Sequence, residues 1–120
     1  MRLDFQSETP IFLQIAEEIE SAIISGAYEE DAQIPSTTEI SVSHKINPAT
    51  VLKGITILVS DGIIYKKRGL GMFVAAGAKQ KIIGKRRKAF SDKYVMPLIS
   101  EAKKLSMDIG DIEELIKRGF

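Results

Sequence analysis

Apolar side chains recur at helical spacing near the start of the chain, and acidic side chains fall largely off that stripe. Thr9 suits the N-cap of this segment and Pro10 suits its first helical position. Gly26 is a natural helix stop. The pattern predicts an amphipathic helix whose apolar stripe packs into a core. The stripe consists of Ile11, Phe12, Ile15, Ile19, Ala22 and Ile23.

Two more helix starts follow. Ser36-Thr37-Thr38-Glu39 has the Ser-x-x-Glu pattern of a capping box, which predicts a short second helix ending near His44. Asn47-Pro48 predicts the start of a third helix, with asparagine as the N-cap, and Gly62 ends it. The expected buried face of the third helix is Val51, Ile55, Leu58 and Val59.

Two short runs of β type come next, at residues 63–67 and 72–75. The glycine-bearing segment Arg68-Gly69-Leu70-Gly71 between them has the length of a hairpin turn. Apolar positions then predict a longer helix over roughly 80–105, kinked or broken at Pro97, and a last short helix after Gly110.

Three helices followed by a hairpin predict an α+β fold that is mainly α. We expect an N-terminal winged helix-turn-helix domain over residues 1–77. A short two-helix C-terminal dimerisation segment is expected over residues 78–120.

Composition narrows the class of protein. With 120 residues, 44% hydrophobic and 28% charged, the chain has the balance of a globular domain plus a short appendage. It has no apolar run long enough to span a bilayer, and Met1–Phe5 lack the apolar core of a signal peptide. The absence of cysteine excludes disulfides and thiolate chemistry. We therefore expect a cytoplasmic protein with no membrane partner.

The net charge of +1 hides a strong asymmetry along the chain. Residues 1–64 carry three basic and ten acidic side chains, whereas residues 65–88 carry nine basic side chains and no acidic one. Such a basic block is either a solvated face or an electrostatic footprint for a polyanion. Its neighbours in the sequence decide between the two interpretations.

Those neighbours favour double-stranded DNA as the partner. The later helix of a helix-turn-helix enters the major groove, so the helix from Asn47 to Ser60 is the expected reader. The start of the second helix suits phosphate oxygens, and the hairpin tip places cations near a minor groove or the backbone. Each feature alone also has a purely structural explanation; their order and spacing favour binding. The expected DNA-binding residues are Ser36, Thr37, Thr38, Asn47, Ala49, Thr50, Lys53, Lys66, Lys67, Arg68 and Gly69.

Ordered motifs extend from about residue 9 to 75. They are Pro10-Ile11-Phe12-Leu13-Gln14-Ile15, Gly26, Ile34-Pro35-Ser36-Thr37-Thr38-Glu39-Ile40, Asn47-Pro48-Ala49-Thr50-Val51, Asp61-Gly62-Ile63-Ile64 and Gly69-Leu70-Gly71-Met72-Phe73-Val74. Together they resemble the GntR family of bacterial transcription regulators. The Asn-Pro-x-Thr-Val helix start, followed by Lys53 and a short tail, resembles the YtrA-type subfamily.

The resemblance implies a repressor that binds an inverted-repeat operator as a homodimer paired through its C-terminal helices. Members of the subfamily often repress genes for membrane transporters. The chain departs from the family at Thr38, Pro48 and Leu52, where many members carry arginine. The departures shift the expected cationic contacts to Lys53 and the hairpin. Gly54 stands where the family favours alanine, and it permits close packing of helices.

The tail is too short to enclose an effector pocket alone, and its apolar positions exceed what a lone helix pair hides. We expect these positions to pack against a second copy; the alternative is packing against the chain's own first helix. The basic block Lys79–Lys88 would then lie near the dimer axis and add phosphate contacts. The expected dimer interface is Phe90, Tyr94, Leu98, Ile99, Ala102, Leu105, Ile112, Leu115 and Ile116.

An enzyme and a protein-interaction module are the alternatives to a DNA-binding regulator. The chain has no nucleophile triad, carboxylate pair or phosphate-cradling loop, and its one histidine is His44. We expect no enzyme activity, cofactor or metal site, and no motif identifies a small-molecule effector. The remaining alternative is a winged-helix protein-interaction module without specific DNA binding. Salt-dependent binding to random duplex DNA separates that alternative from a regulator.

Overall fold

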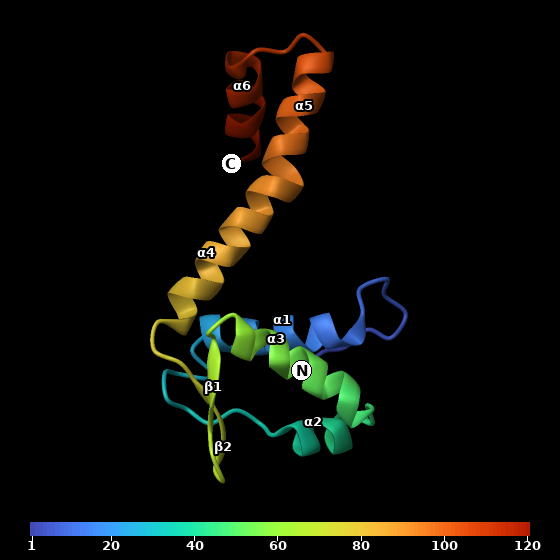
Figure 1. The fold of residues 1–120 in the computed structure, drawn as a ribbon. Helices are drawn as coiled ribbons and strands as arrows, with labels where there is room; N and C mark the ends of the chain where they lie inside the picture. Colours follow the sequence, from blue (N-terminus) through green and yellow to red (C-terminus); the bar gives the residue numbers. More distant parts are fainter. The chain divides into compact units, whose positions relative to one another are not determined.

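The computed structural model describes residues 1–120, which form two compact units, Met1–Ile83 and Gly84–Phe120. The first unit holds α1 (Ile11–Ile24), α2 (Thr37–His44), α3 (Pro48–Ser60), β1 (Ile64–Lys67), β2 (Gly71–Val74) and the first turns of α4 (Ala78–Phe90) (Figure 1). The second holds the rest of α4, the π-helical turn η1 (Ser91–Val95), α5 (Met96–Lys104) and α6 (Ile109–Gly119). Three helices followed by an antiparallel hairpin confirm the winged helix-turn-helix with a helical tail.

One apolar core holds the first unit together. Its largest fully buried side chains come from α1, the loop before α2, α3, the hairpin with the residue before it, and the first turns of α4. Burial of each such side chain stabilises the fold by about 1.5–3 kcal/mol. The fully buried members are Ile15, Ile19, Ile34, Val51, Leu58, Ile63, Ile64, Val74 and Ile82.

The contact between α1 and α3 depends on Gly54. A Cβ atom at position 54 would lie 2.6 Å from the carbonyl oxygen of Phe12, a backbone atom that cannot move aside without shifting α1. Glycine inside a helix costs about 1 kcal/mol relative to alanine. The close approach explains the residue, and it confirms the close packing expected at this position.

The hairpin is paired on both sides of β2. On one side β1 runs antiparallel to it, with Ile64 opposite Val74 and Lys67 opposite Gly71. On the other side, Val74 N–H donates to the Ala32 carbonyl at 2.9 Å. Asp31 N–H donates back to the Val74 carbonyl at 2.9 Å. The loop after α1 therefore acts as a short third strand that ties the hairpin to the helices.

Two sequence expectations about the helices of the first unit are wrong. Thr9 does not cap α1: the helix begins at Ile11, one residue later than expected, so Pro10 is the N-cap and no side-chain hydrogen bond caps the helix. Val59 is 43% exposed rather than buried, because α3 turns it away from α1 and toward the hairpin. The neighbouring α3 positions Val51, Ile55 and Leu58 are buried as expected.

The boundary between the two compact units lies within α4, between Ile83 and Gly84. Ala78 and Ile82 are both 0% exposed and belong to the core of the first unit. The first turns of the tail therefore pack as part of the winged helix.

The helical stretch of the tail changes its winding in front of Pro97. Residues Ser91–Val95 form a π-helical turn, in which Met96 N–H donates to the Ser91 carbonyl five residues earlier. A proline ring clashes with the carbonyl four residues before it in regular α-helix, and a wider turn relieves that clash. The discontinuity expected at Pro97 is this turn.

We predict that Gly54→Ala destabilises the protein by about 1–3 kcal/mol, because the added methyl group forces α1 and α3 apart. Urea denaturation followed by circular dichroism measures the change. Gly84→Ala is the matched control: it is also helical, and no atom lies within 4 Å of an added Cβ. That variant should be unchanged or slightly more stable, and an equally stable Gly54→Ala protein would contradict the packing argument.

Candidate nucleic-acid interface

A reciprocal capping box fixes the start of α2. The Ser36 hydroxyl accepts a hydrogen bond from Glu39 N–H at 3.0 Å, and Ser36 N–H donates to the Glu39 carboxylate at 3.3 Å. This is the pairing expected from the sequence. Thr37 is half-buried and Thr38 is exposed at the same helix end, where the first amide groups lack intrahelical partners.

A left-handed residue and two hydrogen bonds fix the turn between α2 and α3. Lys45 adopts the left-handed conformation, with φ 53°, and ends α2. The buried Ser41 hydroxyl donates to the Ile46 carbonyl at 2.6 Å, and Ile46 N–H donates back to the Ser41 carbonyl at 3.0 Å. These bonds set the direction in which α3 leaves the turn.

The start of α3 presents the residues expected to read DNA. Asn47 caps the helix, since its Oδ1 accepts a hydrogen bond from Ala49 N–H at 2.8 Å. Asn47 and Ala49 are exposed, and Thr50 is half-buried. Asn47 therefore has a structural role in addition to any contact made through its side-chain NH₂ group.

Lys53 is the basic residue of α3, and its side chain reaches toward α1. Its Nζ lies 4.0 Å from the centroid of the Phe12 ring, within the range of a cation–π interaction. The charge therefore lies at the edge of α3 that borders α1.

The wing, defined as residues 64–74, carries its cations on both faces. Lys67 Nζ lies 4.3 Å from the Phe73 ring centroid, on the face that also carries Tyr65. Lys66 lies on the opposite face, toward α2 and α3. Arg68 and Gly69 are exposed at the tip, where Gly69 has φ +78°. Two of the three wing cations therefore extend from opposite faces, and Arg68 extends from the tip.

Gln33 fixes the wing tip. Its Nε2 donates to the Leu70 carbonyl at 2.8 Å. Gly71, with φ +132°, leaves room for this amide, since a Cβ there would lie 2.6 Å from Gln33 Nε2. A neutral side chain from the loop before α2 thus positions the charged turn.

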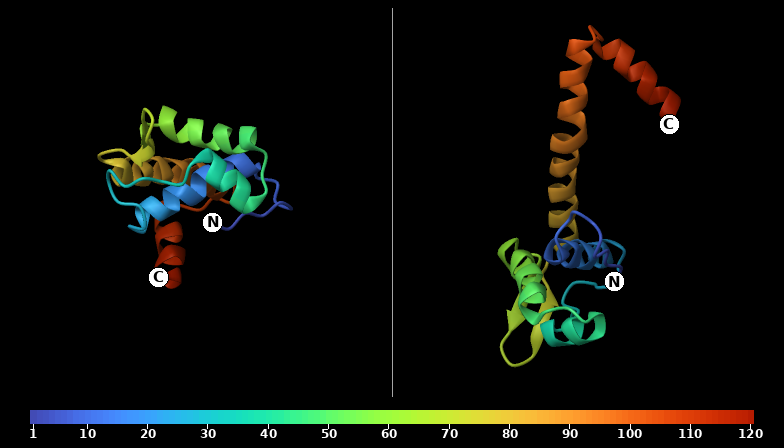
Figure 2. Two further views of the ribbon diagram at one scale, coloured as in Figure 1. Left: turned by 90° about the horizontal axis from the view of Figure 1, so that it is seen from below. Right: turned by 90° about the vertical axis from the view of Figure 1, so that its right-hand side faces the viewer.

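The start of α2, the exposed face of α3 and the wing enclose one cavity of about 540 Å³, here called the wing groove. Its neighbours α2 and the hairpin tip project to the same end of the first unit (Figures 1 and 2). Four of the expected DNA-binding residues line the groove: Ser36, Thr37, Thr38 and Lys66. The other seven lie outside its lining: Asn47, Ala49, Thr50, Lys53, Lys67, Arg68 and Gly69. The sequence did not point to five other residues that line the groove: Gln33, Leu52, Thr56, Val59 and Leu70. Leu52 could have been identified from the sequence, because it is an apolar side chain that lies off the buried stripe of its helix.

The second unit carries the apolar positions expected to form a dimer interface. Ala102 is buried and Ile112 is half-buried, whereas the other seven expected residues are exposed, from 39% for Ile99 to 61% for Leu105. A cavity of about 480 Å³ lies between α5 and α6. Leu98, Ile99, Ala102, Ile112 and Ile116 line it, whereas Phe90, Tyr94, Leu105 and Leu115 do not.

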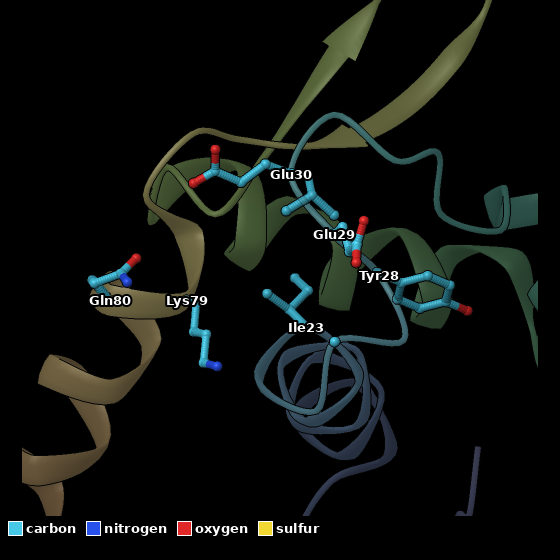
Figure 3. Close-up of a pocket in the computed structure, with 8 residues that line it drawn as sticks. Ile23, Tyr28, Glu29, Glu30, Lys79 and Gln80 are labelled. Carbon is cyan, nitrogen blue, oxygen red and sulfur yellow. The ribbon is translucent and has the colours of Figure 1, made fainter.

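A smaller pocket of about 290 Å³ lies where the loop after α1 meets the first turn of α4 (Figure 3). Ile23 forms its apolar wall, and Glu29 and Lys79 supply charges of opposite sign. The Glu30 carboxylate accepts a hydrogen bond from Gly77 N–H at 2.7 Å. The polar groups here join the loop to the start of α4, and the cations of the wing lie elsewhere.

No group of three or more histidine, aspartate or glutamate side chains is arranged to hold a metal ion. His44 stands in the last turn of α2. No helix combines the length and the apolar character needed to cross a membrane.

The sequence was compared with characterised proteins. It is 26% identical to the HTH-type transcriptional repressor YtrA of Bacillus subtilis over 117 residues, which is 98% of this chain and 89% of YtrA. It is 33% identical to the repressor NagR of the same organism over 75 residues. That alignment covers 62% of this chain but only 31% of NagR, so the likeness to NagR is confined to one part of that longer protein.

Solved structures match the fold. A GntR-family regulator from Bacteroides thetaiotaomicron is 38% identical and superposes with a TM-score of 0.77, covering 92% of this chain and 99% of the other. The DNA-binding domain of AraR, solved in complex with its operator ORX1, is 35% identical with a TM-score of 0.56, covering 62% of this chain and 93% of that domain. The family model for bacterial regulatory proteins of the gntR family matches residues 12–74. This chain therefore belongs to the gntR family of bacterial regulatory proteins.

Proposed function

We propose that this protein represses transcription by binding an inverted-repeat operator as a homodimer. Binding of DNA by the first unit rests on membership of a family whose AraR domain is solved on its operator. The observation that carries the proposal for this chain is the wing groove. It brings the start of α2, the exposed face of α3 and a cationic wing around one concave surface.

Each part of this surface has a role in the proposal. The exposed side of α3, from Asn47 to Lys53, enters the major groove and meets base edges. The start of α2, with Ser36, Thr37 and Thr38, contacts phosphate oxygens. The wing cations contact the backbone and the adjacent minor groove. Aromatic contacts hold Lys53 and Lys67 in defined directions before DNA arrives, which lowers the entropic cost of fixing them.

The second unit supplies the dimer in this proposal. Burial of its exposed apolar side chains against a second copy would stabilise the protein. A pair of DNA-binding units related by a two-fold axis matches an operator with two inverted half-sites. YtrA, which is similar to this chain over nearly its full length, is a transcriptional repressor, and this similarity supports the proposed repression. The proposed activity is binding without catalysis, in the cytoplasm, where bacterial DNA is located. Dimerisation is assigned to residues 78–120. The first turns of α4 belong to this segment and also pack in the core of the first unit.

We predict that binding to duplex DNA weakens steeply with salt and that Arg68→Ala lowers the slope. Loss of one phosphate contact should reduce the slope of log affinity against log salt by about 0.9. Fluorescence anisotropy with a labelled duplex measures it. Lys104→Ala is the control, because Lys104 is exposed in α5 and lies 3.9 Å from the Glu101 carboxylate. Absence of binding even at low salt would instead favour a protein-interaction module.

We predict a different signature for Gln33→Ala. The variant loses the hydrogen bond that fixes the wing tip but loses no charge. Affinity should therefore fall by about threefold to tenfold, which corresponds to the usual net value of one hydrogen bond. The salt slope should stay that of the unchanged protein. A changed slope, or unchanged affinity, would remove Gln33 from the positioning of the wing.

We predict that Ile116→Glu dissociates the dimer, because it places a carboxylate in the apolar groove between α5 and α6. Sedimentation equilibrium should show the dimer dissociation constant rising by at least about tenfold. Lys117→Glu, on the same helix but outside the groove, is the matched control and should remain dimeric. A monomeric unchanged protein, or an equally stable Ile116→Glu dimer, would contradict the assigned interface.

A further inference from the structure

The exposed face of α3 is built of methyl groups. Ala49, Leu52 and Thr56 are all exposed, and Leu52 is 54% exposed. Their spacing of three and four residues places them on one side of the helix. Leu52 and Thr56 also line the wing groove. The part of α3 that faces a partner across this groove is therefore largely apolar.

Three polar side chains near this face already have contacts within the protein. The Thr56 hydroxyl donates to the Leu52 carbonyl at 2.8 Å, so this O–H group already has its acceptor within the helix. Lys53 Nζ lies over the Phe12 ring at the α1 edge. Asn47 Oδ1 accepts a hydrogen bond from Ala49 N–H as the helix cap. In the middle of α3 the surface left for a partner is therefore mainly carbon, with the Thr56 hydroxyl oxygen as an acceptor.

We propose that this face reads thymine methyl groups, with Leu52 as the specificity-determining residue. The inference rests on the proposed binding of DNA in the wing groove. Among the four bases, thymine is the one that presents a methyl group in the major groove. Burying that methyl group against Leu52 removes apolar surface from water on both partners. Lys66 lines the same groove and Arg68 is exposed at the wing tip, so the cations that suit DNA phosphates stand on the wing beside the apolar contact.

Substituting deoxyuridine for thymine tests the proposal, because it deletes the 5-methyl group and leaves base pairing unchanged. An operator is first selected from random duplexes with the full chain, and each of its thymines is then replaced in turn. At the thymine that faces Leu52, affinity should fall by about fourfold, the value expected for one buried methyl group. Fluorescence anisotropy of the paired duplexes measures the ratio.

Protein variants assign the contact to its residue. Leu52→Ala should bind the thymine operator more weakly and lose most of the uracil penalty at that one position. Val42→Ala is the matched control: Val42 is an exposed apolar side chain of α2, 74% exposed and outside the wing groove, and it should keep the full penalty. Circular dichroism verifies that both variants are folded.

The outcomes separate this inference from the function on which it rests. Equal affinity for the thymine and uracil operators at every position would overturn the inference and leave DNA binding intact. A penalty of unchanged size in Leu52→Ala would also overturn the assignment to Leu52. Failure to bind any duplex at low salt would overturn the proposed function itself.

Discussion

The close approach of α1 and α3 at Gly54 is the constraint on which the rest of the first unit depends. With no side chain at position 54, the helix can lie against the Phe12 carbonyl, and Ile15 and Val51 become fully buried. The same contact places the Phe12 ring under the Lys53 ammonium group. One missing methyl group thus sets both the core packing and the direction of a cation on the surface proposed to bind DNA.

The wing depends on a second set of contacts, made by the loop before α2. Backbone pairing with Val74 and the Gln33 amide on the Leu70 carbonyl extend the sheet by a short strand and hold the tip. A two-stranded hairpin is marginal in water by itself. Residues before the helix-turn-helix therefore complete a wing that lies after it in sequence, which makes the wing groove a property of the whole unit.

Much of the fold followed from short-range chemistry. The capping box at Ser36, the Asn47 cap, the glycines of the hairpin and the period of the apolar stripes predicted the winged helix-turn-helix, and the structure confirmed it. Two expectations about the helices were wrong. The start of α1 lies one residue later than its capping pattern suggested, with Pro10 rather than Thr9 as the N-cap. Val59 faces the wing because the core already occupies the other side of α3, and that core is built from segments distant in sequence.

The sequence by itself determined which segments are helical or extended, which faces are apolar and where basic charge gathers, because propensity, capping and periodicity act within a few residues. Only the tertiary structure decided that Lys53 points to Phe12, that Gln33 holds the wing and that Leu52 faces an open groove. The helical period predicts which side chains point away from the core. Which segments stand opposite them depends on contacts between residues distant in sequence, and those form only when the whole unit folds.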